Sequence, residues 1–471
     1  MYYLLDENYL LRGFQKLPYC LVKRPENSLC FLNVEAFEAL CLCDGQINVS
    51  LPVITEETRE ILVELEKMGI VHSCDKQLTR KEGQEYRKHE NRYIHTAHWS
   101  ITGKCNYRCK HCYMSAPEAK LGELPHETVM DIAKQIADCG IAEVSLTGGE
   151  PLVRADFLEI VDALISRGVR ISQIYSNGKL VTEKLLQELK KRGIAPEFNM
   201  SYDGDEGWHD WLRGMPDAGK TVLRAFDLCY EMGFPTGAET CLHQGNLHLL
   251  RQSLNTLAAH HCGHVKTNPV SDTALWKQYG ADYSISLEEL YGAYLEYIPE
   301  FFEDGMPISV MLGGFFQCSK GSIDWVIPSV KGSGAPCRDS VICGHARQTL
   351  YLSPEGRMLP CMPLSAQPIQ ENYPKVTDGG LAKGLSDSSY MQLVSTTLAD
   401  YLEQNTECAS CEYRWKCAGG CRASALQFSQ DNIMAPDRAV CLLFRGGYCD
   451  KIKEAAQKAI EKTTQQNGET A

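Results

Sequence analysis

Between residues 94 and 305 the chain alternates β-rich and helical segments six times, and this alternation restricts its fold more than any other feature. The β-rich segments are Thr96–Thr102, Glu143–Thr147, Arg170–Ser176, Glu197–Tyr202, Thr236–Cys241 and His264–Asn268. The intervening segments, such as Glu127–Cys139, carry apolar residues at helical spacing. Repeated βα units predict a parallel sheet with helices outside, either open or curled toward a barrel. Functional groups are then expected at the carboxyl ends of the strands.

Residues 1–74 form a separate α+β unit in this interpretation. Tyr19–Lys23 and Leu29–Asn33 read as the strands of a hairpin. A short helix over Glu35–Leu42 and a second helix from Thr55 to Gly69 follow, and Ile70 begins a last strand. This order predicts a winged-helix-like domain. Residues 75–93 are almost entirely polar and charged, which is typical of a linker.

Regular periodicity weakens over residues 306–449, where cysteines become dense. Residues 311–336 are rich in Gly, Ser and Phe and are predicted as loop. Residues 450–471 are expected to form a helix, Asp450 to Lys462, with a disordered tail.

The charge balance disfavours several classes of partner. With 47 Lys and Arg against 60 Asp and Glu the net charge is −13, which favours neither nucleic acid nor an anionic membrane surface. No apolar run approaches the roughly 18 residues of a membrane span, and the acidic N-terminus does not resemble a secretion signal. A cytoplasmic location follows as the expectation, and there the 22 cysteines are more often metal ligands or catalytic groups than disulfides.

Three cysteines form a dense cluster just after the first predicted strand. Cys105, Cys109 and Cys112 have the spacing C-x3-C-x2-C. Three thiolates hold three irons of a four-iron cube and leave the fourth iron open for a ligand. A structural zinc ion needs four ligands, and His111 adjoins Cys112 too closely to supply the fourth without strain.

This triad, followed by Thr147-Gly148-Gly149-Glu150-Pro151 after the second strand, resembles the radical S-adenosylmethionine (SAM) enzymes. The resemblance implies a partial (β/α)6 TIM-like barrel of the α/β class. It also implies that the open iron and the Gly148–Pro151 segment bind SAM, with Glu150 accepting from its ammonium group. The polar residues that end strands three and four are expected at the methionine carboxylate and ribose; they are Ser176, Asn177, Ser201 and Asp203. Ser201 is preferred, whereas Asn177 and Asp203 serve equally well as ordinary turn residues.

Three residues of the segment GWHDWLRG are weaker candidates. His209, Asp210 and Arg213 fit the substrate side of the same site, although surface or structural roles are favoured for each.

A second set of cysteines lies in the C-terminal region. Cys343 and Cys361 precede Cys408-x2-Cys411-x5-Cys417-x3-Cys421, and Cys441 follows. This pattern resembles SPASM domains, the cysteine-rich iron–sulfur domains of radical enzymes that modify peptides and proteins. The resemblance implies two auxiliary 4Fe–4S clusters, one on Cys337, Cys343, Cys361 and Cys421 and one on Cys408, Cys411, Cys417 and Cys441. Cys318 is an alternative to Cys337, and a zinc ribbon is the alternative for the whole set. With the triad, three 4Fe–4S clusters use eleven cysteines, and the other eleven are expected to be packing residues.

Residues 1–74 also resemble the leader-recognition elements of peptide-modifying enzymes, with a structural cap or dimerisation wing as the alternative. Together these resemblances imply a maturase that oxidatively modifies a ribosomally made precursor peptide through a 5′-deoxyadenosyl radical, with a thioether crosslink as the favoured product. They imply a flavodoxin or ferredoxin as electron donor and an organism living at low oxygen. A sulfatase maturase is the first rival, but those relatives place an aspartate where Met362 follows Cys361 here. A non-enzymatic electron-transfer protein is the second, and the open-iron triad argues against it.

Overall fold

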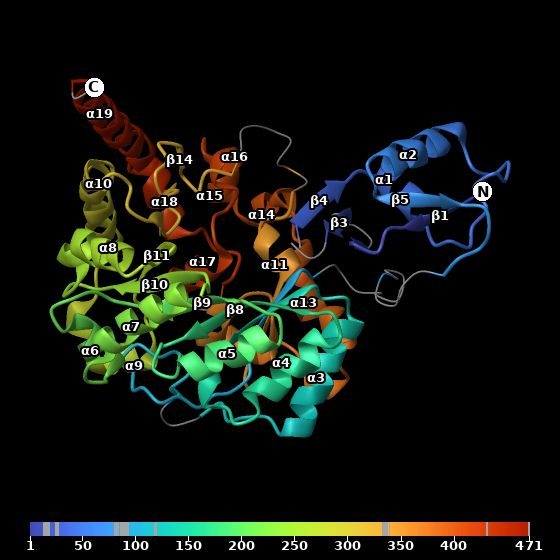
Figure 1. Ribbon diagram of the computed structural model, residues 1–471. Coiled ribbons are helices and arrows are strands. Elements are labelled where there is room, and N and C mark those ends of the chain that lie inside the picture. The colour runs from blue at the N-terminus through green and yellow to red at the C-terminus, as the bar shows by residue number, and fades with distance from the viewer. Residues whose placement is uncertain are drawn as a thin grey trace.

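The computed structural model describes residues 1–12, 19–23, 28–79, 84, 94–116, 120–331, 338, 340–429 and 432–469. Its centre is an 11-stranded sheet with the strand order β14-β13-β12-β11-β10-β9-β8-β7-β6-β15-β16 (Figure 1). The middle six strands are parallel neighbours in chain order. They are β6 (Thr96–Ser100), β7 (Glu143–Thr147), β8 (Arg170–Ser176), β9 (Glu197–Ser201), β10 (Thr236–Leu242) and β11 (His264–Pro269). The predicted βα repeat is confirmed.

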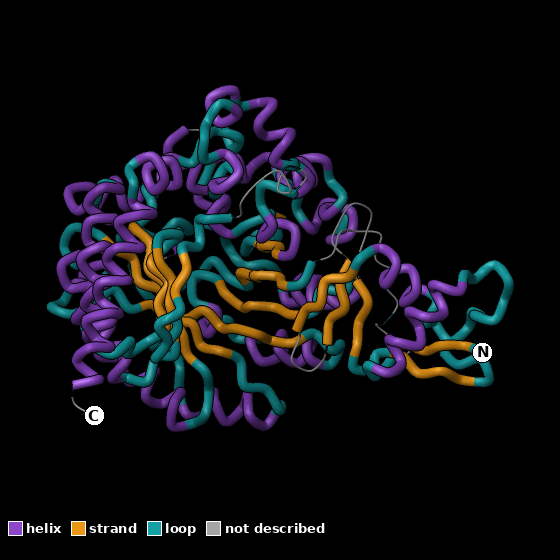
Figure 2. Tube along the Cα trace, turned by 90° about the horizontal axis from the view of Figure 1, so that it is seen from above, coloured by secondary structure: helices purple, strands orange, loops and turns teal. Residues whose placement is uncertain are grey.

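Helices cover the outer side of this curved sheet (Figure 2). The larger ones are α3 (His126–Asp138), α4 (Phe157–Ile165), α5 (Glu183–Lys191), α7 (Ala218–Glu231), α8 (Leu250–Ala259) and α10 (Leu287–Glu303). Shorter helices are α6 (Trp208–Arg213) and α9 (Ala274–Tyr279), with 3₁₀ turns η3 (Pro151–Val153), η4 (Leu247–Leu249) and η5 (Ala281–Tyr283). Alternate strand residues such as Trp99, Leu146 and Phe198 are buried in the main core. Because side chains alternate between the faces of a strand, His98, Asn199 and Lys266 belong to the opposite, polar face.

The C-terminal region adds strands to both edges of the same sheet. β12 (Ser309–Leu312) pairs in parallel with β11, and β13 (Phe316–Cys318) and β14 (Trp325–Val326) continue it antiparallel. At the other edge β15 (Thr349–Leu352) pairs in parallel with β6, and β16 (Met358–Leu359) pairs with β15. The prediction of loop over residues 311–336 is therefore wrong for β13, β14 and the end of β12. These strands are too short to show a period, and burial of Leu312 and Phe316 against the core decides their conformation.

The N-terminal region contains two small sheets and two helices. β1 (Tyr2–Leu5) pairs with β5 (Val71–Cys74), and β2 (Tyr9–Arg12), β3 (Tyr19–Lys23) and β4 (Ser28–Leu32) form a three-stranded sheet with β4 at its edge. The helices are α1 (Val34–Cys41) and α2 (Glu56–Lys67). The predicted hairpin strands, helices and last strand are present, whereas β1 and β2 were not predicted. The turn at residues 24–27 and most of the linker 75–93 lie outside the described residues.

This region has its own core and lies to one side of the main body (Figure 1). Leu10, Cys20 and Val22 on β2 and β3 pack with Ala142, which precedes β7. Side chains of β2 and β3 thus attach the N-terminal sheet to the body, and among the described strands β2 and β4 are its two edge strands.

Short helices separate the C-terminal cysteines. They are α11 (Gly344–Gln348), α12 (Leu381–Leu385), α13 (Ser388–Ser395), α14 (Leu398–Gln404), α15 (Thr406–Ala409), α16 (Arg414–Cys417), α17 (Arg422–Ser429) and α18 (Arg438–Arg445), with 3₁₀ turns η7 (Met362–Ala366), η8 (Pro368–Asn372) and η9 (Val376–Asp378). The last helix, α19 (Tyr448–Glu469), buries Ile452 and Ala456, and Lys462 forms an ion pair of 2.9 Å with Glu303 on α10. The predicted disordered tail is wrong as far as Glu469. Within the described part of the chain, no helix is both long and apolar enough to cross a membrane.

Candidate active site

The three cysteines of the triad lie in the loop that follows β6. The backbone N–H of Tyr107 donates to Cys105 Sγ at 3.4 Å, and that of Ala116 donates to Cys112 Sγ at 3.5 Å. Burial raises the pKa of the Cys109 thiol, and the charge of the nearby Arg213 offsets part of this rise. By contrast, Cys262 Sγ donates to a backbone carbonyl at 3.1 Å, as a protonated packing thiol does. Backbone N–H groups thus reach two triad sulfurs, which suits thiolate ligands of a cluster, and the Cys105 thiol itself lies 3.9 Å from Asn106 Oδ1, to which it donates.

The Gly148–Glu150 segment at the end of β7 packs directly on this loop. Gly149 N donates to Thr102 O at 2.8 Å, and Glu150 N donates to Lys104 O at 2.9 Å. A Cβ atom on Gly149 would lie 2.3 Å from Lys104 O, and one on Gly148 would lie 2.6 Å from Thr102 O. Close approach of two backbones therefore requires both glycines. The packing of these backbones explains the two glycines independently of the SAM contact that the resemblance implied.

Glu150 brings the end of β8 to the same place. Its carboxylate is fully buried and accepts from Ser176 Oγ at 3.0 Å, Asn177 N at 2.8 Å and Leu152 N at 3.2 Å. Burial raises the pKa of this carboxyl to about 7. Asn177 Nδ2 also donates to Asn106 Oδ1 at 2.6 Å, inside the triad loop. Glu150, Ser176 and Asn177 are thus gathered around the cysteines, as expected for one site.

Pro151 begins η3, and Arg154, a residue that sequence reasoning missed, caps its end. Arg154 is buried and donates to Ile101 O at 2.8 Å, to Leu124 O and to the carboxylate of Asp156. It therefore fixes the end of β6 relative to η3. A lone arginine gives no signal for this role in the sequence.

Asp203 and Arg213 form a buried ion pair below the triad loop. Arg213 Nε donates to Asp203 Oδ2 at 2.6 Å, and its Nη2 donates to Oδ1 at 2.9 Å. Cys241 N donates to Oδ1 at 2.9 Å, and His209 Nδ1 lies 3.0 Å from Oδ2. Burial alone would raise the pKa of Asp203, but the charge of Arg213 holds it far below its usual value. Both oxygens of the Asp203 carboxylate therefore accept hydrogen bonds from groups of the protein itself.

The remaining candidates on this side are more dispersed. Ser201 ends β9 and is half-buried. Asp210 accepts from Asp217 N at 2.7 Å and Gly219 N at 2.8 Å, where α7 begins. His209 is buried beside Asp203.

Two groups of cysteines meet in the C-terminal region. Cys343, Cys361 and Cys421 lie close enough that each neighbour raises the pKa of the Cys361 thiol, beyond the larger effect of burial. Cys408, Cys411, Cys417 and Cys441 form the second group on the same kind of evidence, and Tyr401 OH lies 3.4 Å from Cys408 Sγ.

Cys337, the expected eighth ligand, lies outside the described residues. Its alternative, Cys318, is buried on β13 and donates to Ser322 O at 3.2 Å and Asp324 O at 3.4 Å. These contacts lie within the turn that follows Cys318.

A tyrosine of the C-terminal region reaches the triad loop. Tyr351 OH on β15 lies 2.9 Å from Ser100 Oγ at the end of β6 and 3.4 Å from Tyr113 OH. These contacts join the two cysteine-bearing regions. Sequence reasoning missed them because the parallel pairing of β15 with β6 was not predicted.

A single metal ion and an iron–sulfur cluster require different spacings of their thiolate ligands. Among the residues that the structure describes, no three His, Cys, Asp or Glu side chains converge closely enough to hold one metal ion. The sulfurs around one zinc ion lie only about 3.8 Å apart, because each Zn–S bond is about 2.3 Å. A cube of four irons holds its thiolates farther apart, and the N–H donors on the triad sulfurs match that chemistry.

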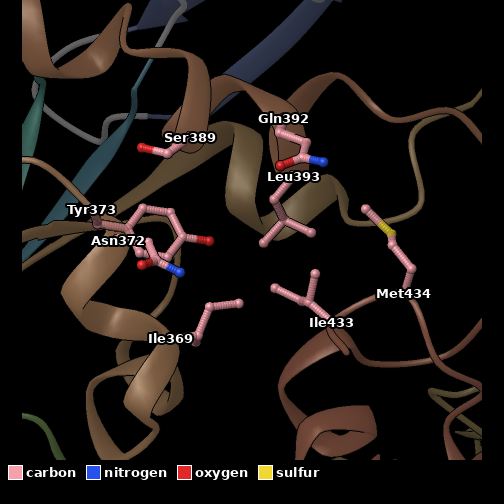
Figure 3. A pocket seen from close by; sticks show the side chains of 8 residues that line it. All are labelled: Ile369, Asn372, Tyr373, Ser389, Gln392, Leu393, Ile433 and Met434. Atoms are coloured by element: carbon pink, nitrogen blue, oxygen red, sulfur yellow. The ribbon is translucent and has the colours of Figure 1, made fainter. Parts of the chain in front are cut away.

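A small cavity lies elsewhere, between η8, α13 and the loop before α18 (Figure 3). It measures about 70 Å³ and is lined by Ile369, Tyr373, Leu393 and Met434 among others. A cofactor pocket needs several hundred cubic ångströms. This cavity contains no candidate cysteine in its lining and is not the active site.

Comparisons with known proteins agree with this geometry. Residues 99–248 match the family model of the Radical SAM superfamily. The chain is 26% identical to an AdoMet-dependent heme synthase of Methanosarcina barkeri over 71% of its own length and 93% of that protein. It is also 26% identical to a PqqA peptide cyclase of Granulibacter bethesdensis over 70% of its own length and 83% of that protein.

Solved structures share the fold at low identity. Streptococcus suis SuiB bound to S-adenosylmethionine aligns over 93% of this chain and 99% of SuiB, with a TM-score of 0.65 and 16% identity. The protein anSMEcpe with bound AdoMet and a peptide aligns over 79% of this chain and 99% of its own, with a TM-score of 0.56 and 16% identity.

Fold, triad and family match together define a class: the chain is a radical SAM enzyme. Within that class its architecture is like that of SuiB and anSMEcpe, and its sequence is related to the PqqA peptide cyclases.

Proposed function

We propose that this radical SAM enzyme oxidatively modifies a ribosomally made precursor peptide, with a thioether between a cysteine sulfur and a carbon as the product. The observation that carries the proposal is the combination of three elements in one chain. These are a SAM-type triad, two further groups of cysteines and an N-terminal sheet with a free edge strand. SuiB, which aligns with 93% of this chain, has been crystallised with its precursor peptide SuiA.

Three cysteine sets would hold the cofactors in this proposal. Cys105, Cys109 and Cys112 hold the SAM-binding 4Fe–4S cluster. One auxiliary cluster binds to Cys343, Cys361 and Cys421 with Cys337, and the other binds to Cys408, Cys411, Cys417 and Cys441. When bound and reduced, the first cluster supplies the electron that splits SAM into methionine and a 5′-deoxyadenosyl radical, the species that removes hydrogen from the substrate.

The chain's own residues shape the SAM end of the site. Gly148 and Gly149 let the end of β7 lie against the triad loop, and Pro151 turns the chain away from it. Ser176 and Asn177 orient the Glu150 carboxylate, which is the acceptor proposed for the SAM ammonium group. Ser201 is proposed as a contact for the methionine carboxylate or ribose. Asp203 is proposed to act indirectly, because Arg213 and Cys241 N occupy its oxygens.

The free edge at β4 is the proposed leader-binding site. β4 pairs with β3 alone in the sheet order, and Phe31 on it is 56% exposed. An extended peptide adds to such an edge as another strand through backbone hydrogen bonds. Binding the leader there raises the effective concentration of the core peptide at the barrel.

The rival function of formylglycine formation is less well supported. Met362 and Pro363 follow Cys361 and begin η7, so no carboxylate stands at the position where sulfatase maturases place their aspartate. The heme synthase relative acts on a different kind of substrate, but the free β4 edge favours a peptide.

The decisive experiment is anaerobic reconstitution followed by analysis of iron and products. We expect about twelve iron atoms per chain and 5′-deoxyadenosine after strong reduction. Replacing Cys105, Cys109 and Cys112 together by Ala should remove about four irons and all SAM cleavage. A wild-type chain that forms no 5′-deoxyadenosine would rule out the proposal.

A second experiment addresses the substrate. A short, cysteine-containing peptide encoded beside this gene should gain a crosslink detectable by mass spectrometry, whereas an adjacent sulfatase would favour the rival. Deleting residues 1–74 should weaken binding of the full-length peptide but not of its core segment. Equal affinity for both chains would remove the leader role.

A further inference from the structure

Arg213 is a buried cation beside one of the triad cysteines. It ends α6 and is 8% exposed, and its positive charge offsets part of the rise that burial causes in the pKa of the Cys109 thiol. Its guanidinium group makes two hydrogen bonds to Asp203, at 2.6 and 2.9 Å. Burying a charge is costly unless it is paired, so the Asp203 carboxylate stabilises the cation in this position.

The backbone around Arg213 fixes its distance from Cys109. Arg108 N donates to Arg213 O at 3.2 Å, and Lys110 N donates to Leu212 O at 2.8 Å. These two bonds lie on either side of Cys109. Gly214 follows with φ 61°, and a Cβ there would lie 2.4 Å from Arg108 O. Backbone hydrogen bonds therefore hold the last turn of α6 against the triad loop.

Asp203 is held just as firmly from the other side. It follows β9, Cys241 N on β10 donates to Oδ1 at 2.9 Å, and Asn246 Nδ2 donates to Asp203 O at 2.7 Å. The carboxylate is fully buried. In this pair the cation, Arg213, lies beside Cys109, and the anion, Asp203, lies on the far side of the guanidinium group.

We propose that Arg213 is a positioning residue that sets the reduction potential of the triad cluster, and that Asp203 moderates its effect. The inference rests on the proposed function, because it takes Cys105, Cys109 and Cys112 as cluster ligands. Reduction adds negative charge to a cluster, and a buried cation beside one thiolate stabilises that charge. Arg213 therefore raises the potential, and the negative charge of Asp203 offsets part of this rise.

The experiment is a redox titration followed by electron paramagnetic resonance, on the reconstituted full chain. The triad signal is the one that changes when SAM is added. Arg213→Gln should shift its midpoint to a more negative potential. Arg213→Lys keeps the charge, so its midpoint should stay close to that of the wild type. Asp203→Asn should shift the midpoint in the opposite direction, because it leaves the cation uncompensated.

The control is Arg445→Gln. The pKa of Arg445 is raised by Cys411 of the second auxiliary group and by Glu407, and Arg445 is far more exposed than Arg213, so this variant should leave the SAM-sensitive signal unchanged. An unchanged midpoint in Arg213→Gln with full iron content overturns the inference, as do shifts of the same sign in Arg213→Gln and Asp203→Asn. If Arg213→Gln does not load iron, the other two variants provide the test. A more positive midpoint in Asp203→Asn together with a midpoint near the wild-type value in Arg213→Lys supports the inference, and any other result overturns it. A wild-type chain without any SAM-sensitive signal would instead contradict the proposed function.

Discussion

Gly149→Ala tests the contact between the end of β7 and the triad loop. The added Cβ would lie 2.3 Å from Lys104 O and 2.7 Å from the Lys104 carbonyl carbon. A carbon and an oxygen normally stay about 3.3 Å apart, so one backbone must move by about 1 Å. Neither can move freely, because Glu150 N also donates to Lys104 O at 2.9 Å. Such overpacking typically costs about 1–3 kcal/mol.

The displaced atoms lie next to Cys105, so the effect on function should exceed the effect on stability. A misplacement of about 1 Å in a site lowers the rate by about 100-fold. We expect Gly149→Ala to lower the urea midpoint of the apoprotein and still to bind about twelve irons after reconstitution, because all three triad cysteines are kept. SAM cleavage should fall by about two orders of magnitude.

The matched control is Gly292→Ala in α10, where nothing lies within 4 Å of the new Cβ. That change should stabilise the chain by about 0.4–1 kcal/mol and leave iron content and SAM cleavage unchanged. If Gly149→Ala kept wild-type SAM cleavage, the close approach of the two backbones would have no role in the site.

Three further predictions follow from the described contacts. The folded pKa of Glu150, about 7, lies above its unfolded value near 4.5. Ionisation of the buried carboxyl should therefore lower the unfolding free energy of the apoprotein by about 3 kcal/mol as the pH rises from 4.5 to above 7. Urea titrations at pH 5 and pH 8 should show this loss, and Glu150→Gln should remove that part of the pH dependence. Ile452→Ala in α19 should lower the unfolding free energy by about 2–5 kcal/mol, whereas the exposed Lys458→Ala should change it by less than about 0.5 kcal/mol; equal effects would mean that α19 is not part of the core. Cys411→Ala should lower iron from about twelve to about eight per chain while 5′-deoxyadenosine still forms, and unchanged iron would contradict the second auxiliary site.

The central repeat could be predicted from sequence because each element carries its own local signal. β7 and β8 begin and end at the predicted residues, and α10 begins with the capping box of Ser286 and Glu289. Buried parallel strands are apolar and bounded by glycines or polar turns, so their limits are written locally. The cysteine groups could be anticipated for the same reason, since ligand spacing within a loop is a local property.

Contacts between distant segments could not be predicted in this way. Nothing near Thr349 indicates that β15 pairs with β6, and nothing near Asp203 indicates that its partner is Arg213 rather than a cofactor. The sequence places Asp203 just after a strand and Arg213 in the following helical segment, but it does not say where their side chains point. Pairing of that kind depends on the packed structure, and so the role of Glu150 as a link between β7 and β8 also appeared only there.

The pairing of β15 with β6 has a consequence for synthesis. Thr96 pairs with Thr349, so 253 residues must be translated between the two halves of this contact. At about 5–20 residues per second, β6 waits about 13–50 s on the nascent chain before its partner leaves the ribosome. Throughout that interval the strand beside the triad loop exposes an unpaired edge, which other chains can join. Expression that slows the C-terminal region, or a chain that stops before residue 349, should therefore aggregate before any cluster is inserted.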